Sequence, residues 1–492
     1  MNLVYHIFSK LKIWLENPYN KIFVLLLVIG VFLRFYRLEG FVTFLGDQGR
    51  DAIVLKRMIT FEHFPAIGAP SSVGQVFLGP FYYYFIAPWL LLSGFHPIGP
   101  AIGVAFFSSL FLVAAYLIIS EFFDKKVALV TVCLLTFSEA LITLSRYSWN
   151  PNLLPLAVLL LFYLLIKAIR NNDKRQFFLA GALFSITIQL HYVALALALP
   201  IGILLMRFLY KSKKPLTLSR PLKSIGVMAL SFSILTSPLL IFDLRHDFLN
   251  TKNLIALFTS SGSVGSSGLT AIFPTFTTLT SFVLGYEVSP VLAVAVLLFM
   301  GAALFLARKE AKPIGLVMFF FLTTLLVTSL YTGRKIPHYF GALYLFYYLI
   351  LGYILTRYFW NKKLGIILVV FLTGFIMLQF PRYSFLLNNP NNQIQKSMKV
   401  AQIISQNTEA DQYQVTSLPY QYSDSTYRYF LEIWGNRPVE KDSIDRSNEL
   451  FVVCEGECKP IGDPQWDIAF FAPNRVLGTW DTGDVRIYKL IR

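Results

Sequence analysis

The residues best suited to chemistry form one short run, Gly46-Asp47-Gln48-Gly49-Arg50-Asp51, directly after the first apolar segment. A carboxylate at a membrane edge can take a proton from an acceptor hydroxyl or hold a metal ion. Glycines in the same run let the backbone approach a ligand closely. The alternative is that Asp47 only caps a helix that starts at Gln48. The run therefore predicts either a general base or a helix cap at Asp47.

Two further polar groups interrupt apolar sequence farther along the chain. The first, Arg146-Tyr147-Ser148-Trp149-Asn150-Pro151-Asn152, ends one apolar block. A helix cap and a first helical residue explain Asn150 and Pro151, but neither explains Arg146. The second, His191 and Tyr192, interrupts a long apolar run. A histidine there is either a satisfied core residue or a ligand contact.

A cationic patch follows at Arg334-Lys335-Ile336-Pro337-His338-Tyr339. Guanidinium, ammonium and imidazole groups together suit a phosphate. A last charged group begins a long loop that we predict over 243–289, and it is either a solvated turn or an edge of the site: Asp243, Arg245, His246 and Asp247.

The elements that must position these groups follow from composition. Apolar residues make up 55% of the 492-residue chain and charged residues 14%, against roughly 25% charged in soluble domains. The apolar residues form blocks long enough to cross a hydrocarbon core of ~30 Å. The net charge of +16 comes from basic residues in short loops between these blocks, which is the positive-inside pattern. The composition therefore predicts an all-α polytopic membrane domain and argues against a nucleic-acid partner.

We predict eleven crossing helices. They are 22–38, 101–120, 127–144, 153–169, 176–190, 193–210, 223–242, 290–307, 314–331, 339–357 and 364–381. Basic residues near 10–21 and 125–126, and within 167–175, 207–223, 308–312 and 357–363, place those loops and the N-terminus in the cytoplasm.

One apolar segment, 77–95, does not fit this alternation as a crossing, because Lys125 and Lys126 would then face outside. Its Gly79-Pro80 start and its tyrosines and Trp89 favour a helix in the outer interface. A twelfth crossing is the alternative. The first outer loop, 39–100, also contains a predicted amphipathic helix over 48–60. In this topology all the polar groups lie on the outer face, which implies a substrate with a lipid tail and an anionic head.

The tail, 382–492, has more charge and shorter apolar stretches, which predicts a small extracytoplasmic α/β domain. Its predicted helices are 398–405 and 425–434, and its predicted strands are 412–417, 450–454, 468–472 and 485–490. Cys454 and Cys458 would face an oxidising compartment and form a disulfide. A metal site is less favoured, since two cysteines do not complete a zinc site. The Ser/Gly-rich stretch 260–268 has the composition of a flexible linker.

Taken in order, four motifs resemble the GT-C superfamily of membrane glycosyltransferases over residues 20 to about 380. They are Asp47 in the first outer loop, Gly79 to Tyr84, Arg146 to Asn152, and Lys335 to Tyr339. The chain is most similar to the branch of protein O-mannosyltransferases and aminoarabinose transferases. The resemblance implies transfer of a sugar, mannose or another hexose or pentose, from a polyprenyl-phosphate donor, with inversion. The implied acceptor is a lipid, protein or glycan at the outer face of the cell membrane.

The resemblance also implies roles for residues. Asp47 would be the general base, and Arg146, Lys335 and His338 would hold the donor phosphate. The other predicted substrate-binding residues lie in or next to these motifs, or in the polar interruption at 191–192: Arg50, Asp51, Tyr82, Asn150, His191, Tyr192, Arg334 and Tyr339. The family often has an acidic residue directly after its aspartate, where this chain has Gln48, so we predict that no divalent metal or other cofactor is required.

Two other classes of membrane protein remain as alternatives. A transporter of lipids or sugars would show internal repeats and helices broken at mid-membrane, whereas here the charges cluster at one face. A lipid-linked polysaccharide polymerase or ligase would use the same class of donor but usually carries its site on a large outer loop. The early position of Asp47 argues against that class.

Overall fold

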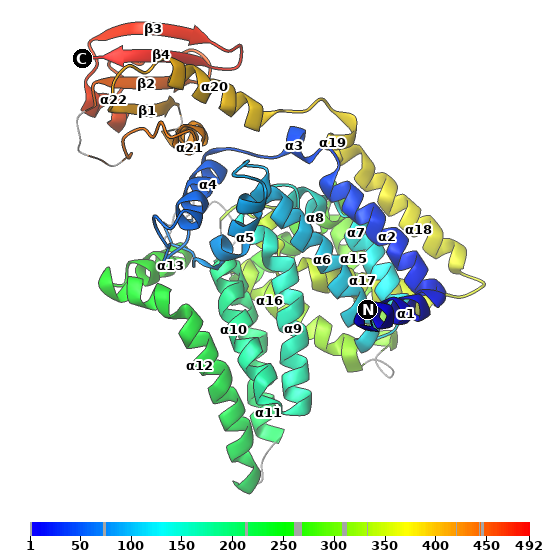
Figure 1. The fold of residues 1–492 in the computed structure, drawn as a ribbon. Helices are drawn as coiled ribbons and strands as arrows, with labels where there is room; N and C mark the ends of the chain where they lie inside the picture. The colour runs from blue at the N-terminus through cyan, green and yellow to red at the C-terminus, as the bar shows by residue number, and fades with distance from the viewer. Residues whose placement is uncertain are drawn as a thin grey trace.

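The computed structural model describes the chain except for Met1 and residues 72–74, 212–214, 260–267, 308–311, 332, 420, 442 and 444–446. Most of the described chain is helical, and a small sheet, with helices of the tail beside it, lies at one end of the molecule (Figure 1). The flexible linker predicted over 260–268 falls almost entirely outside the described residues.

All eleven predicted crossing segments are helical. The helices are α2 (Pro18–Phe35), α6 (Gly99–Phe122), α7 (Lys125–Phe137) with α8 (Glu139–Leu144), α9 (Leu154–Asn171), α10 (Lys174–Leu190), α11 (Ala198–Lys211), α12 (Pro215–Arg245), α15 (Pro290–Ala307), α16 (Lys312–Ser329), α17 (Tyr344–Phe359) and α18 (Gly365–Gln379). The single helix predicted over 127–144 is divided at Ser138, whose hydroxyl caps α8 by accepting the Leu141 N–H. The all-α membrane fold is therefore confirmed.

Within the described residues, six helical stretches are long and apolar enough to cross a membrane. They are Pro18–Phe35, Gly99–Phe122, Asn150–Asn171, Tyr192–Lys211, Arg220–Arg245 and Gly365–Arg382. The shorter apolar helices include α15 and α16. The total of eleven crossings stays a prediction.

The described part of the loop predicted over 39–100 contains both helices expected there. The amphipathic helix predicted over 48–60 is α4 (Gly46–Ile59), and the apolar segment 77–95 contains α5 (Phe81–Leu92). At 1.5 Å per residue, the twelve residues of α5 span about 18 Å. That length is too short to cross ~30 Å of hydrocarbon, which supports a helix at the interface rather than a twelfth crossing.

The prediction of a long loop over 243–289 is wrong in one respect, because the segment contains helices α13 (Leu249–Thr259) and α14 (Ile272–Leu284). The α14 helix is part of the bundle: Phe276, Leu279 and Val283 are buried in the core. Four threonines lower the apolar density of α14. Two of them, Thr275 and Thr280, are buried and return their hydroxyls to carbonyls one turn earlier.

The remaining elements are an N-terminal helix, two short helices and several 3-10 turns. They are α1 (Asn2–Glu16), α3 (Leu38–Phe41), α19 (Ser384–Leu387) and the 3-10 turns η1 (Asn150–Leu153), η2 (Tyr192–Leu197), η3 (Gly268–Ala271), η4 (Pro337–Phe340), η5 (Phe380–Arg382) and η6 (Gln421–Asp424).

In the described part of the tail, four strands form one sheet in the order β1-β2-β4-β3. The elements are β1 (Tyr413–Leu418), β2 (Glu449–Cys454), β3 (Arg475–Asp481) and β4 (Arg486–Ile491), with helices α20 (Gln393–Asn407), α21 (Ser425–Ile433) and α22 (Trp466–Phe471). Strands β1 and β2 are parallel, and the other pairs are antiparallel. The predicted α/β character is confirmed, while the division at residue 381 stays a prediction.

Two details of the predicted tail are wrong. The strand expected over 468–472 is helix α22, in which Ile468 and Phe471, three residues apart, both pack into the core under the sheet. The strand β3 was not predicted, because it lies at the edge of the sheet and is largely exposed. Its sequence therefore lacks the apolar alternation of a half-buried strand.

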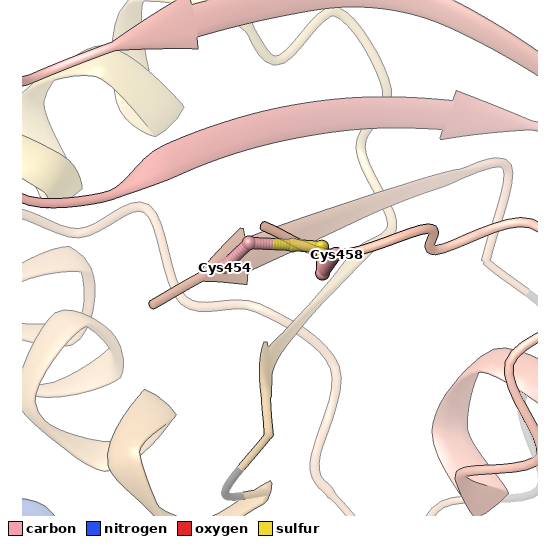
Figure 2. Close-up of a disulfide and its surroundings, with 2 residues drawn as sticks. All are labelled: Cys454 and Cys458. Atoms are coloured by element: carbon pink, nitrogen blue, oxygen red, sulfur yellow. A yellow bond between two sulfur atoms is a disulfide. The ribbon is translucent and has the colours of Figure 1, made fainter. Parts of the chain in front are cut away.

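A disulfide joins Cys454 at the end of β2 to Cys458, as predicted (Figure 2). We expect both thiols of the native protein to resist a maleimide reagent and to react after reduction with dithiothreitol and unfolding. Intact mass measured before and after reduction checks this expectation. Free Cys133, which lies in α7 and is partly buried, reports whether the reagent reaches thiols among the membrane helices. Labelling of Cys454 without reduction would contradict the disulfide and weaken the extracytoplasmic placement of the tail.

Candidate functional site

The first part of the site is the start of α4, where two carboxylates share one guanidinium. Arg50 donates from Nη1 to Asp47 Oδ1 at 2.7 Å, and from Nε and Nη2 to Asp51 Oδ1 at 3.0 and 2.9 Å. The side chain of Gln48 accepts the Leu45 N–H at 3.1 Å. Gln48 therefore closes the start of the helix, and Asp47 makes no capping bond in the described chain.

The two carboxylates of α4 differ in exposure. The side chain of Asp51 is 1% exposed and accepts the Tyr83 hydroxyl at 3.0 Å, whereas that of Asp47 is 40% exposed. Burial raises the pKa of Asp51, and the charge of Arg50 opposes this shift. Burial alone would lower the pKa of Arg50, but Asp51, Tyr83 and Asp47 together raise it. Asp51 therefore pairs with Arg50 in the protein interior, whereas the Asp47 carboxylate is partly open to solvent.

Asp47 lines an open pocket with about 1110 Å³ of empty space. The other residues of this first pocket are Thr43, Leu45, Gly46, Gln48, Thr143, Tyr147, Trp149 and Ser423. A carboxylate in such a position can be reached by a hydroxyl from solvent.

A second pocket, with about 780 Å³ of empty space, lies beside η2 and η4. Its wall is mainly apolar, and its polar residues include Lys335, His191, Tyr192, Tyr331 and Tyr339. The ammonium of Lys335 donates to the Tyr331 carbonyl at 2.6 Å. Burial lowers the pKa of Lys335, so a phosphate beside it would favour the charged ammonium. The second pocket combines an apolar wall with a cation, as a lipid phosphate requires.

Aromatic contacts link the two pockets. The ring of Trp149, in the first pocket, lies 4.4 Å from the ring of His338. The His338 ring in turn lies 5.4 Å from His191 and 4.6 Å from Tyr339, which line the second pocket. Sequence reasoning did not select Trp149. Its place in the Arg146 to Asn152 run was the available signal.

The two histidines are held in the neutral form. Burial, with a smaller contribution from His338, lowers the pKa of His191 to about 3, and burial lowers that of His338 to about 4. The Nδ1 of His191 accepts the Val193 N–H at 3.2 Å. With neutral imidazoles, Lys335, which is partly buried, is the cation that lines the second pocket. The predicted contact of His338 with the donor phosphate stays a prediction.

We expect these histidines to make the protein less stable in acid. Both pKa values lie below the ~6.5 of an unfolded histidine. Between pH ~6.5 and 4 the unfolded chain therefore binds protons that the folded protein excludes, and stability falls as the pH falls. The melting temperature in detergent should drop from about pH 7 to pH 5, and less in a His191→Gln/His338→Gln double variant. Exposed His63 offers the control, since His63→Gln should keep the wild-type drop. An equal drop in the double variant would contradict this explanation.

Arg146 does not reach either pocket. Its guanidinium donates to the carbonyls of Leu33, Arg34 and Tyr36 at 2.9 to 3.1 Å and stacks 3.9 Å over the ring of Phe385. These carbonyls belong to the C-terminal end of α2, where a cation is favourable. Burial lowers the pKa of Arg146 to about 10. The structure therefore gives Arg146 a structural contact with the end of α2, and its predicted contact with the donor phosphate stays a prediction.

Other predicted residues lie around the two pockets. Tyr82 is buried, and its hydroxyl lies 2.5 Å from Ser148 Oγ. The buried side-chain amide of Asn150 makes no hydrogen bond in the described chain, although buried polar groups normally have a hydrogen-bond partner. Tyr192 donates to the Phe77 carbonyl at 2.6 Å, and Arg334 is exposed beside Lys335.

The charged group at 243–247 lines neither of the two pockets. Its first residue, Asp243, does not belong to a solvated turn. Asp243 is buried and accepts the N–H groups of Asn250 and Thr251 at 2.7 and 3.2 Å, so it fastens α13 to α12. Within the described chain, His, Cys, Asp and Glu side chains form no group of three that could hold a metal ion.

The chain is similar to known proteins in part of its sequence and in its fold. The family of dolichyl-phosphate-mannose-protein mannosyltransferases matches residues 78–242. No curated protein matches the sequence.

Two solved structures are similar over most of the chain. ArnT from Cupriavidus metallidurans, bound to undecaprenyl phosphate, has a TM-score of 0.63 at 12% identity and covers 95% of this chain and 97% of its own. The oligosaccharyltransferase AglB from Archaeoglobus fulgidus, in complex with an inhibitory peptide and a dolichol-phosphate, has a TM-score of 0.54 at 13% identity. That match covers 89% of this chain and 69% of AglB.

Proposed function

This chain has the GT-C fold of PMT-like membrane glycosyltransferases, and from that premise we propose that it transfers a sugar from a polyprenyl-phosphate donor to an acceptor hydroxyl. Asp47 is the general base, the anomeric centre is inverted, and the reaction takes place at the outer face of the cell membrane. The donor sugar is a hexose or a pentose, and the acceptor is a lipid, protein or glycan.

One observation carries this proposal. A partly exposed carboxylate lines the first pocket and a cation lines the apolar second pocket, and the contact between Trp149 and His338 joins residues around the two pockets. A sugar joined to a lipid phosphate needs an apolar wall, a cation for the phosphate and a base beyond the sugar. The two linked pockets supply these groups in that order.

In the donor complex we propose, the phosphate lies beside Lys335, and the first isoprene units follow the apolar wall of the second pocket. Neutral His338 and His191 and the Tyr339 hydroxyl are hydrogen-bonding groups near that phosphate. The sugar extends toward Trp149, whose ring offers an apolar face for it. The unpartnered amide of Asn150, next in the chain, is suited to a sugar hydroxyl or a water.

The proposed transfer is a single displacement. The Asp47 carboxylate takes the proton of the acceptor hydroxyl as its oxygen bonds to the anomeric carbon. The bond from that carbon to the phosphate oxygen breaks, and the electron pair leaves with the polyprenyl phosphate. Lys335 stabilises the charge that develops on the leaving phosphate. Attack opposite the leaving group inverts the configuration.

The experiment that tests the function is a scan of donors with the purified protein in lipid vesicles. Polyprenyl phosphates carrying different hexoses and pentoses are incubated with mixed acceptors, and the products are identified by mass spectrometry. We expect at least one donor to yield free polyprenyl phosphate together with a glycosylated acceptor. Movement of an intact lipid or sugar across the vesicle without cleavage of any donor would support a transporter instead.

A further inference from the structure

Helix α4, which carries Asp47, lies between the membrane bundle and the C-terminal domain (Figure 1). On the bundle side, Asp51 accepts the Tyr83 hydroxyl, and Gln48 donates to the Ser148 carbonyl at 3.2 Å. On the other side, α4 packs along α21 of the C-terminal domain. The position of Asp47 is therefore determined by contacts on both sides.

Gly49 lies where the backbones of α4 and α21 come very close together. A Cβ atom at this position would lie 2.5 Å from the Ser425 carbonyl carbon and 2.5 Å from the Thr426 nitrogen. These are backbone atoms at the start of a helix and cannot rotate away as a flexible side chain can. Gly49 therefore lets two helix backbones touch, where the sequence had suggested a close approach to a ligand.

An ion-pair cluster holds the other end of α4. Arg57 donates from Nε and Nη2 to the two carboxylate oxygens of Glu432 at 2.9 and 2.7 Å, and from Nη2 to Glu440 at 2.7 Å. Lys56 lies 3.4 Å from the same Glu432 carboxylate. The Glu432 side chain is only 4% exposed. A bidentate pair of this kind fixes orientation as well as distance.

Residues next to α4 are attached to the same helix of the C-terminal domain. The ring of Phe44 lies 6.3 Å from Tyr429 and 6.0 Å from Phe430. The Tyr429 hydroxyl donates to the Phe95 carbonyl, just beyond α5, at 2.5 Å. Helix α21 therefore contacts both ends of the first outer loop and α4 within it.

We propose that α21 positions α4, so that the C-terminal domain is a working part of the catalytic centre, with Gly49, Arg57 and Glu432 as its positioning residues. This inference rests on the proposed role of Asp47. A shift of α4 by the width of one methyl group would move Asp47 relative to the donor. Misplacement of about 1 Å can cost roughly 10²-fold in rate.

The first test is Gly49→Ala, a substitution that usually stabilises a helix but that we expect to destabilise this protein. Alanine is the better helix former, so a glycine without a neighbour should tolerate it or gain stability. Gly374 in α18 is the matched control, because no atom lies near the position of its Cβ. We expect Gly49→Ala to lower both the melting temperature and kcat, the latter by roughly 10²-fold, and Gly374→Ala to change neither. Wild-type kcat in Gly49→Ala would overturn the inference.

The second test does not depend on Gly49. Arg57→Glu and Glu432→Arg each place like charges together, and the double variant restores an opposite pair. We expect each single variant to lower kcat with an unchanged Kd for undecaprenyl phosphate, and the double variant to recover part of the loss. Arg486→Glu, which breaks the exposed pair with Asp481 in the sheet, controls for the charge change. Losses that simply add in the double variant would overturn the inference.

Hydrogen exchange over residues 46–59 separates this inference from the proposed function. Faster exchange in the single variants, together with lower kcat, supports both. Faster exchange with unchanged kcat would mean that α4 does not carry the base, and the proposed function would fail with it. Unchanged exchange and kcat in Arg57→Glu, while Asp47→Asn is inactive, would overturn the inference and leave the proposed function standing.

Discussion

Asp47→Asn is expected to lower sugar transfer by roughly 10²–10⁴-fold, the usual loss when a general base is removed. Asparagine has nearly the same shape as aspartate and can still accept the hydrogen bond from Arg50, but it does not take the acceptor's proton. Binding of the donor should persist, because Lys335 lines the second pocket and Asp47 does not. Initial rates with a saturating donor, read by mass spectrometry, measure the effect.

The control for this substitution is stability. Asp47 is partly exposed, and Gln48 closes the start of α4, so the melting temperature of Asp47→Asn should stay close to wild type. Asp51→Asn is the contrasting variant. It removes the charge that faces Arg50 inside the protein, and we expect it to lower stability as well as rate. Near-normal transfer by Asp47→Asn would leave Asp47 without a catalytic role.

Lys335→Gln is expected to weaken binding of undecaprenyl phosphate by roughly 10- to 100-fold. A hydrogen bond to a charged group contributes about 1.5–3 kcal/mol, and about 1.4 kcal/mol corresponds to a factor of ten. With His191 and His338 neutral, no other positive charge of the second pocket takes the place of this ammonium in the described chain. Titration of the purified protein with undecaprenyl phosphate gives the Kd directly.

The neighbouring residue provides a matched control. Arg334 carries the same charge one position earlier but is exposed and does not line the second pocket. Arg334→Gln should therefore change the Kd only slightly, and the small change should vanish at high salt. If both variants weaken binding equally, the effect comes from the general positive charge of this loop rather than from a site at Lys335.

The membrane helices could be predicted from sequence because burial in lipid selects for apolar composition over a fixed length. This signal needs no knowledge of neighbours, and all eleven segments are helical. It failed for α14, whose threonines satisfy their own hydroxyls within the helix and so reduce its apolar density without weakening its packing. It also failed for β3, since an exposed edge strand carries little pattern.

The site could be predicted only in part, because the direction of a side chain depends on tertiary packing. The sequence marked the Arg146 to Asn152 run, but Arg146 binds the end of α2, while Trp149 from the same run lines the first pocket. Gly49 likewise was identified as important, but its neighbour is a helix more than 370 residues later in the chain. Such long-range contacts leave no local signature.

The anomeric configuration of the product tests the central account most directly. A donor of known configuration is supplied to the protein in vesicles, and the linkage formed on the acceptor is assigned by nuclear magnetic resonance. A single displacement with Asp47 as the base predicts that the configuration is inverted in every product molecule. Retention would require two successive displacements or attack from the face of the leaving group, and would contradict the proposed mechanism.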